Sequence, residues 1–504
     1  MSRMVLRVRT FVGVVAVASL AAGAYAAPTA LIDAIKSGNQ QAARAALKQT
    51  KDVNTPEADG TTALHWAVRG NDVELARMLL RAGAKADVAN RYGLTPLMLA
   101  AENGSAAVID ALLAAGANAN AALPEGETVL MRAARTGKVD AMKVLIAHGA
   151  TVDATEGWQG ETALMWAAGQ NHGGAVRLLV EAGANVNARS AKKTFPRARN
   201  GNSVLPKGEW TPLMFAAREG ALDATGALIE SGADLNATDP DGTTALSYAV
   251  INAQFDVAAL LIEKGARLDV PDSAGATALY AAVDMHTLPW MFGRPDPIVR
   301  SKLTSLDVVK LALEHGANPN VRLKNPTIQR YHSAGDQALG EGATPFMRAA
   351  KAGDVAVMRL LLEHGARPGA LLRNHTTALM IASGYGWRDK NAQTSRDRAP
   401  DADIIAAIQL CLDSGLDVNA FNDAGETPLH VAAARSLPIV KFLVEHGAKA
   451  DMRDRRGRTP LDVTLAGPAP AADADAPVSK GFDPQVVEYL RQVTPGGARP
   501  APTR

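Results

Sequence analysis

The chain has 504 residues, with 53 Lys and Arg against 51 Asp and Glu. This balance of charge excludes a protein that is drawn as a whole to nucleic acid or to a membrane surface. The single cysteine, Cys411, excludes an intrachain disulfide, and its distance from the N-terminus excludes a lipid-anchored bacterial lipoprotein. Its apolar surroundings (QLCLDSG) favour a buried small hydrophobe over a reactive thiol.

The first 26 residues predict a secretory signal peptide. Arg3, Arg7 and Arg9 form a positive start, residues 11–24 form an apolar run, and an Ala-Tyr-Ala cleavage pattern follows at 24–26. The apolar run is too short to span a bilayer as a permanent helix. We therefore expect an exported, periplasmic protein with no stable membrane span; an uncleaved anchor is the alternative.

One unit of sequence recurs along the rest of the chain, and it is clearest at residues 90–123. Thr95 begins a helix because its hydroxyl can accept a hydrogen bond from an unpaired backbone N–H at the N-cap. Pro96 fits the next position, where a backbone donor would have no partner. Gly104 turns the chain into a second helix, which Gly116 ends. Neither helix can bury its apolar side alone, so the unit must stack on copies of itself.

Copies of this unit follow one another at steps of about 33 residues where no insertion intervenes. The motifs TALH (62–65), TPLM (95–98 and 211–214) and TPLH (427–430), followed by segments of the type LLxxGAxxN, resemble ankyrin repeats. The resemblance covers roughly residues 31–493. The helix-starting residues are Thr62, Thr95, Thr128, Thr162, Thr211, Thr244, Thr277, Thr344, Thr377, Thr427 and Thr459.

This resemblance implies an all-α fold, an ankyrin-repeat solenoid of helix–turn–helix repeats with hairpin fingers. About eleven repeats follow an N-terminal capping repeat. The expected segments are a signal peptide at 1–26, the capping repeat at 27–56, repeats one to four at 57–189, a basic finger insertion at 190–208, repeats five to seven at 209–321 with an insertion at 285–304, a second finger insertion at 322–342, repeats eight to eleven at 343–493 with insertions at 388–402 and 467–481, and a disordered tail at 494–504.

The first finger insertion is strongly basic. It contains Lys192, Lys193, Arg197, Arg199 and Lys207 and no acidic residue. Such a loop either contacts an acidic partner or anionic headgroups, or is simply solvated and disordered. Nucleic acid is not an expected partner, because no aromatic platform for base stacking accompanies the charge.

Two of the other insertions carry aromatic side chains. Trp290 and Phe292 lie in the insertion of repeat seven, and Tyr331 lies in the second finger insertion. Apolar rings are costly to leave in water, so the rings of repeat seven either pack back on the solenoid or form a binding tip. We expect all three to be insertion-loop contacts.

By the same resemblance, partners lie against the finger tips and the exposed edge of the first helices. Trp158 and Trp210 lie in turns, where we expect them to meet a partner or to pack between adjacent fingers, whereas Trp66 and Trp166 lie within first helices and are expected in the core. The expected partner-binding residues are Arg91, Tyr92, Glu102, Arg135, Trp158, Gln159, Trp210, Arg218 and Glu219.

The search for catalytic chemistry finds little. No HExxH, GxSxG, CxxC or phosphate-binding GxxxxGK pattern is present. His65 and His430 occupy the fourth position of the TPLH motif, where the resemblance implies that the ring hydrogen-bonds to neighbouring backbone. A site built from loops with His286, Asp296 and His332 is the remaining alternative. We expect no metal and no cofactor.

These observations predict a recognition protein. The favoured interpretation is that the protein is a monomeric, non-catalytic scaffold, which binds a protein partner through the concave face of first helices and fingers. One alternative is an accessory or protective factor for an exported enzyme, possibly a redox enzyme. Another is an enzyme whose residues come from the insertion loops.

Overall fold

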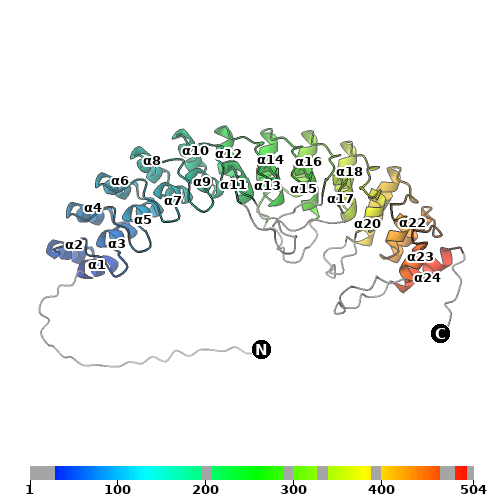
Figure 1. The fold of residues 1–504 in the computed structure, drawn as a ribbon, viewed down its shortest axis with the longest axis horizontal. Coiled ribbons are helices and arrows are strands. Elements are labelled where there is room, and N and C mark those ends of the chain that lie inside the picture. Colours follow the sequence, from blue (N-terminus) through cyan, green and yellow to red (C-terminus); the bar gives the residue numbers. More distant parts are fainter. Residues whose placement is uncertain are drawn as a thin grey trace, which may run out of the picture.

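In a computed structural model, the chain folds into one curved row of paired helices (Figure 1). The structure describes residues 29–193, 207–287, 299–325, 339–386, 399–465 and 483–495. In these ranges 24 helices follow one another, and each odd-numbered helix pairs with the even-numbered helix after it. The predicted all-α solenoid, with a capping pair followed by eleven further pairs, is confirmed.

The helices have the following bounds. The first helices of the pairs are α1 (Thr29–Lys36), α3 (Ala63–Arg69), α5 (Pro96–Asn103), α7 (Val129–Arg135), α9 (Ala163–Gly169), α11 (Pro212–Glu219), α13 (Ala245–Ile251), α15 (Ala278–His286), α17 (Pro345–Ala352), α19 (Ala378–Ala382), α21 (Pro428–Ala432) and α23 (Pro460–Leu465). The second helices are α2 (Gln40–Gln49), α4 (Val73–Arg81), α6 (Ala106–Ala114), α8 (Val139–Ala147), α10 (Gly173–Glu181), α12 (Leu222–Glu230), α14 (Phe255–Glu263), α16 (Ser305–Glu314), α18 (Val355–Glu363), α20 (Asp401–Asp413), α22 (Leu437–Glu445) and α24 (Pro484–Val493).

The helix starts follow the predicted N-cap chemistry. The hydroxyl of Thr95 accepts a hydrogen bond from the backbone N–H of Met98 at 3.3 Å, and Pro96 occupies the first helical position of α5. The same Thr-Pro start begins α11, α17 and α21. Local sequence therefore determines where each first helix begins.

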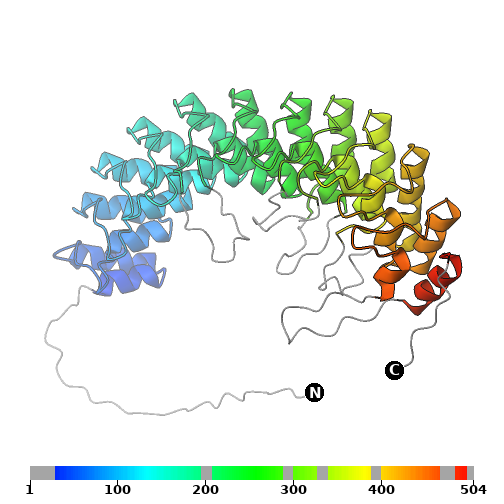
Figure 2. The ribbon, with the colours of Figure 1, turned by 45° about the vertical axis from the view of Figure 1, so that its right-hand side comes forward.

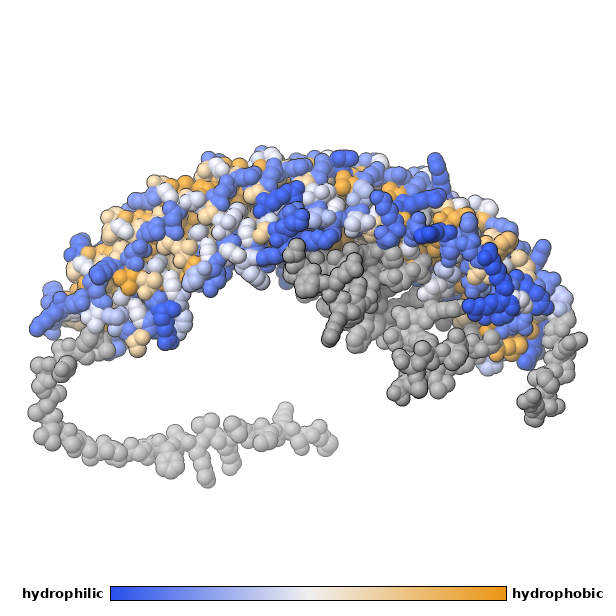
Figure 3. Space-filling model, in the orientation of Figure 1, coloured by the Kyte–Doolittle hydropathy of each residue, from blue (hydrophilic) through white to orange (hydrophobic). Residues whose placement is uncertain are grey.

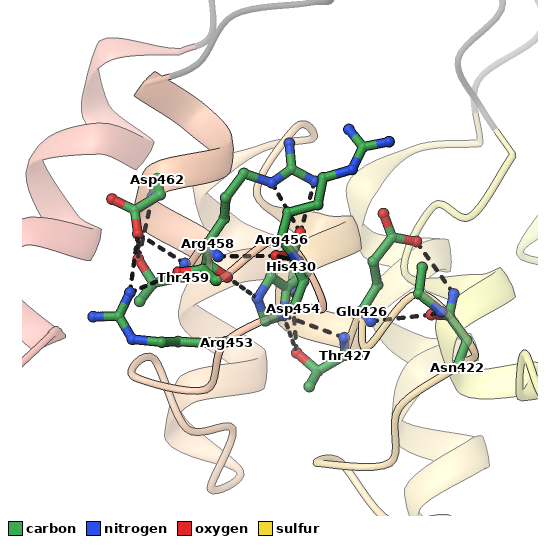
Figure 4. A network of polar contacts seen from close by, with 12 residues as sticks. Asn422, Glu426, Thr427, His430, Arg453, Asp454, Arg456, Arg458, Thr459 and Asp462 are labelled. Carbon is green, nitrogen blue, oxygen red and sulfur yellow. Dashed lines mark hydrogen bonds and ion pairs between the residues drawn. The ribbon is translucent and has the colours of Figure 1, made fainter.

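The histidine of the TPLH motif joins one repeat to the next. Nδ1 of His65 accepts from the backbone N–H of Thr62 at 3.1 Å, and Nε2 lies 3.1 Å from the carbonyl oxygen of Leu94 in the next finger. Nε2 of His430 lies 3.0 Å from the carbonyl oxygen of Arg458 in the same way (Figure 4). Burial lowers the pKa of both imidazoles, which favours the neutral ring that this pattern needs. The predicted role of both residues is confirmed.

The fingers are tight turns that touch their neighbours. In the last finger, the carboxylate of Asp454 accepts from the backbone N–H groups of Arg456 and Arg458, each at 2.9 Å (Figure 4). Adjacent fingers are also joined by main-chain hydrogen bonds, such as the one from Arg91 N–H to the Asp59 carbonyl at 2.9 Å. Each finger is thus held both internally and by the finger before it.

The hydrophobic core runs along the whole row of described helix pairs. Fully buried alanines at equivalent positions of the first helices, among them Ala100, Ala133 and Ala167, let neighbouring pairs approach closely. Larger side chains such as Leu112 fill the space between first and second helices, and each contributes about 1.5–3 kcal/mol on burial. Cys411 in α20 is part of this core, as predicted.

Some predicted boundaries need correction, and others cannot be compared. Helix α15 extends to His286, so the insertion predicted at 285–304 is shorter than expected. Helix α20 already begins at Asp401, so the insertion predicted at 388–402 is also shorter than expected. The signal segment and nearly all of the predicted tail lie outside the described residues. Among the described helices, none is both long and apolar enough to cross a membrane.

Candidate functional site

The first helices line the inner side of the arc, and the second helices line its outer side (Figures 1 and 2). Four positions after the helix-starting Thr, the side chains of several early repeats contact finger residues. In the first six repeats this inner row comprises Trp66, Leu99, Arg132, Trp166, Phe215 and Tyr248.

The outer side has a different character. On the face shown in Figure 3, apolar patches lie over the second helices of the N-terminal half, among polar side chains. Partly buried residues of these helices, such as Leu80, Ile146 and Val180, pack against the core. These patches are the margin of the core, so the search for a site turns to the inner row and the fingers.

Trp66 begins the inner row and is held by polar neighbours. Its Nε1–H donates to the Glu57 carboxylate at 2.6 Å, and Glu57 also pairs with Lys36. The Lys36 ammonium and the Arg69 guanidinium lie 4.5 and 5.3 Å from the ring centroid. The ring is half-buried, so the expectation that Trp66 belongs to the core is only partly right.

Two predicted contact residues, Glu102 and Arg135, meet around Arg132. The Arg132 guanidinium lies 3.0 Å from the carboxylate of Glu102 and 3.0 Å from that of Glu127, and its side chain is buried. The Arg135 guanidinium lies 5.4 Å from the ring centroid of Trp166, which is half-buried and packs against the core, so its expected place in the core is also only partly right. An exposed guanidinium stacked on a ring keeps its N–H donors directed at solvent or at a partner.

Trp210 is a packing residue, so its assignment as a partner contact is wrong. Only 7% of it is exposed, and its ring lies 5.4 Å from that of Phe215 and 4.8 Å from that of Tyr248. The Tyr248 hydroxyl donates to Asp239 at 2.6 Å, and burial raises the pKa of Tyr248. Trp210 instead supports Arg218, whose guanidinium lies 5.2 Å from its ring centroid. Arg218 is the exposed member of this group, and its guanidinium also lies 3.6 Å from the carboxylate of the residue that follows it.

The finger tips expose two large aromatic rings. Tyr92 is 56% exposed and Trp158 is 72% exposed, on fingers that are two repeats apart. The Arg91 guanidinium stacks over the Tyr92 ring at 4.8 Å, and Lys193 donates to the carbonyl of Trp158. These tips present apolar area and positive charge side by side.

The tip that carries Trp158 is rigidly built. The buried carboxylate of Glu156 accepts from the backbone N–H groups of Trp158 and Gln159 at 2.6 Å each, and from that of Glu161 at 2.9 Å. One carboxylate therefore organises the whole turn. A ring that is already fixed in place loses little further freedom when a partner binds it.

The predicted contact residues fall into three groups. Arg91, Tyr92, Glu102, Arg135, Trp158, Gln159, Arg218 and Glu219 are exposed or half-exposed, as expected, and Trp210 is buried. Lys192 lies 3.6 Å from Glu209 at the base of the basic finger. The residues that lie outside the described ranges are Arg197, Arg199, Trp290, Phe292 and Tyr331.

Three inner-row residues were missed as contact candidates: Trp66, Arg132 and Trp166. The signal was available, since all three stand four positions after a helix-starting Thr, as do Phe215 and Tyr248. Alignment of the repeats on that Thr would have found them.

A second set of charges is buried between repeats seven and eight. Arg348 Nε lies 2.5 Å from the Asp284 carboxylate, and His286 Nδ1 lies 2.5 Å from the Asp354 carboxylate. The hydrogen bond to Asp354 raises the pKa of His286. Asp354 also caps α18 by accepting from a backbone N–H. Each of these pairs links α15 to the next repeat.

The alternative of a loop-built site gains no support from these residues. His286 uses Nδ1 to bind Asp354, while Asp296 and His332 lie outside the described ranges. Within the described ranges, no three His, Cys, Asp or Glu side chains are grouped so that they could hold a metal ion. Burial raises the pKa of Cys411 to about 12, so its thiol stays protonated.

Family models of ankyrin repeats match more than half of the chain. The model described as ankyrin repeats (3 copies) matches residues 31–122, 97–190, 197–272, 213–291 and 298–391. The model described as ankyrin repeats (many copies) matches residues 412–463. This chain belongs to the ankyrin repeat family.

Similarity to individual ankyrin proteins is partial. The chain is 36% identical to neurogenic locus notch homolog protein 1 of Danio rerio over 126 residues, which are 22% of this chain and 5% of that protein. It is 43% identical to an ankyrin repeat-containing protein of Schizosaccharomyces pombe over 53 residues, which are 10% of this chain and 26% of that protein. The human ASB11 ankyrin repeat domain is 28% identical, with a TM-score of 0.40, over 47% of this chain and 98% of that domain.

The chain spans only 5% and 26% of the lengths of the two curated relatives. Ankyrin repeats typically mediate protein–protein interaction, and the fold is typically a non-catalytic scaffold. A fold by itself does not choose the partner, which depends on the side chains that the repeats present.

Proposed function

We propose that this ankyrin repeat protein is a non-catalytic scaffold that binds a protein partner across fingers two to five and the inner row beside them. The observation that carries the proposal is the pair of exposed rings, Tyr92 and Trp158, on finger tips two repeats apart. Large exposed rings are uncommon among the described residues of this chain, and Tyr, Trp and Arg are the usual anchors of protein interfaces.

The charge of this surface indicates the chemistry of the partner. Arg91, Arg135 and Arg218 are exposed, and each is stacked on an aromatic ring. Two of them also lie near acidic side chains, Arg135 at 4.0 Å from Glu127 and Arg218 at 3.6 Å from Glu219, and ion pairs between exposed side chains are weak. Planar guanidinium groups bind carboxylates in bidentate fashion. The surface therefore fits a partner that presents carboxylates beside apolar side chains.

We further propose that the protein acts outside the cytoplasm, as a periplasmic monomer. The support is the sequence of residues 1–26, with its positive start, apolar run and cleavage pattern. Fusion of these residues to a phosphatase that is active only after export tests the proposal. An active reporter is expected, and an inactive one would refute export.

Two sets of substitutions test the binding surface. Tyr92→Ala with Trp158→Ala removes the exposed rings, and Arg135→Ala with Arg218→Ala removes the stacked cations. The matched control is Phe421→Ala, because Phe421 is 63% exposed near finger ten, outside the proposed surface. All three variants should keep the helical circular dichroism of the parent, since exposed side chains contribute little to stability.

The readout is capture of the partner from periplasmic extract by the immobilised protein, compared between variants. Loss of capture is expected for both sets, with capture unchanged for Phe421→Ala. Equal capture by all variants, or loss in the control alone, would place the contact elsewhere and defeat the proposal.

A further inference from the structure

The last finger, residues 453–458, carries a charge unlike that of the other fingers. Four of its six residues are arginine, and Asp454 is its only acidic residue. The tip positions, four and three residues before Thr459, are occupied by Arg455 and Arg456. At these two positions no other finger of the sequence has two basic residues.

The single acidic group of this finger is paired inside the turn. Nε and one terminal nitrogen of Arg458 lie 2.9 and 2.7 Å from the carboxylate of Asp454, whose side chain is only 2% exposed (Figure 4). Arg453 spans the turn by donating to the carbonyl of Gly457 at 2.6 Å, and it lies 3.9 Å from the carboxylate of Asp462. These two arginines therefore belong to the frame of the finger.

The two tip arginines are not used in this way. Arg455 and Arg456 are exposed, and in the described part of the chain neither side chain has a hydrogen-bond or ion-pair partner. The Arg456 side chain extends away from the polar network of the finger (Figure 4). Asp423, at the matching tip position of finger ten, bonds His375 at 2.7 Å instead. The tip therefore presents positive charge that its surroundings do not neutralise.

The backbone of the tip indicates what kind of anion it fits. The N–H groups of residues 455–458 are all used: one donates to the carbonyl of Ala424 at 2.9 Å, and three donate to the carboxylate or carbonyl of Asp454 at 2.8 or 2.9 Å. No main-chain donor of the turn is left to enclose a single phosphate. The finger also lacks an aromatic ring on which a nucleic-acid base could stack.

We propose that finger eleven is a second binding surface, which takes an acidic segment of a protein partner. Guanidinium groups bind carboxylates through two parallel hydrogen bonds, so Arg455 and Arg456 fit two neighbouring carboxylates of such a segment. The surface at fingers two to five lies on the other side of repeats six to ten (Figure 1). The chain is then a scaffold with two separate contact surfaces, and the second one rests on finger eleven alone.

The experiment measures binding of fluorescein-labelled decaglutamate to the full chain, by fluorescence anisotropy at low ionic strength. Every protein in the series, the reference included, carries Arg135→Ala and Arg218→Ala, so that the stacked cations of the first surface do not contribute. Adding Arg455→Ala with Arg456→Ala should weaken binding about tenfold, because two exposed charge contacts are lost. Arg455→Lys with Arg456→Lys keeps the charge without the planar fork, so its affinity should lie between the two.

The matched control is Arg81→Ala with Arg359→Ala. Both arginines are exposed on second helices, and their loss changes the net charge by the same amount. The control should bind decaglutamate as the reference does. Raising the ionic strength should remove the difference between the reference and the finger-eleven variant, because salt screens exposed charges. Circular dichroism should be the same for all proteins in the series.

Three results would overturn the second surface as proposed. Equal binding by the reference and the Arg455→Ala, Arg456→Ala variant would show that finger eleven does not take carboxylates. An equal loss in the control would show a response to net charge alone. Tighter binding of phosphatidylglycerol vesicles or of a short single-stranded DNA, lost in the same variant, would assign the tip to a different class of partner. Because the first surface is disabled throughout, none of these results bears on the contacts proposed for Tyr92 and Trp158.

Discussion

Two tryptophans in finger turns, Trp158 and Trp210, should respond in opposite ways to truncation. Trp210 is 7% exposed, and its ring packs against Phe215 at 5.4 Å and Tyr248 at 4.8 Å. Truncation of a buried Trp costs about 3–5 kcal/mol, through lost transfer free energy and the cavity left behind. Trp158 is 72% exposed, so Trp158→Ala should change stability by no more than about 0.5 kcal/mol.

The loss of stability in Trp210→Ala should be confined to the adjacent repeats, because each repeat contacts only its neighbours. A cost of this size raises the local opening constant more than about a hundredfold. Native-state hydrogen exchange should show faster exchange in α11 and α13, with the amides of α3 and α23 unchanged. Urea unfolding followed by circular dichroism gives a second measurement of the same loss. Equal stability of the two alanine variants would refute the packing assigned to Trp210.

The remaining predictions concern titration and thiol chemistry. The hydrogen bond to Asp354 raises the pKa of His286 above its usual 6.5, so the stabilisation is complete below about pH 6.5 and is lost as the pH rises through the raised pKa. The amides of α15 and α18 should therefore exchange faster at pH 8.5 than at pH 6, by more than the intrinsic base catalysis of exchange explains. His286→Gln should abolish this additional increase in rate. Burial lowers the pKa of His65 and His430, so the unfolded state binds more protons at acid pH and stability should fall as the pH drops below about 6.5. Melting temperatures at pH 5 and pH 7 check this, and a smaller fall at pH 5 in a variant with both of these histidines replaced by Gln is the control. Burial raises the pKa of Cys411 to about 12, so an aromatic disulfide reagent should label it only after unfolding, and rapid labelling of the native protein would contradict its burial.

Much of the fold follows from short-range sequence. Thr95, Pro96 and Gly104 place the ends of a helix through capping and backbone preference alone, and the same residues recur from repeat to repeat. The motif role of His65 is also local to two adjacent repeats, and its bond to the Leu94 carbonyl is confirmed. For these reasons the periodic pattern was sufficient to predict an all-α solenoid.

The contact surface could be predicted only in part. Tyr92 and Trp158 lie on exposed tips, as expected from their place in finger turns. Trp210 stands in a turn as well, yet the inner-row residues Phe215 and Tyr248 come from two different repeats and close around it. A turn position in sequence does not reveal what the next repeat places above it.

By itself, the sequence determined which segments are helices, how many units there are and that they must stack, because those properties depend on residues within one repeat length. Only the tertiary structure decided which side chains are shared between repeats. Asp354 holds His286 from 68 residues away, and Asn320 binds the backbone of Gly365 and Arg367 in the next repeat. Such contacts join residues far apart in the chain, and no local pattern encodes the distance between them.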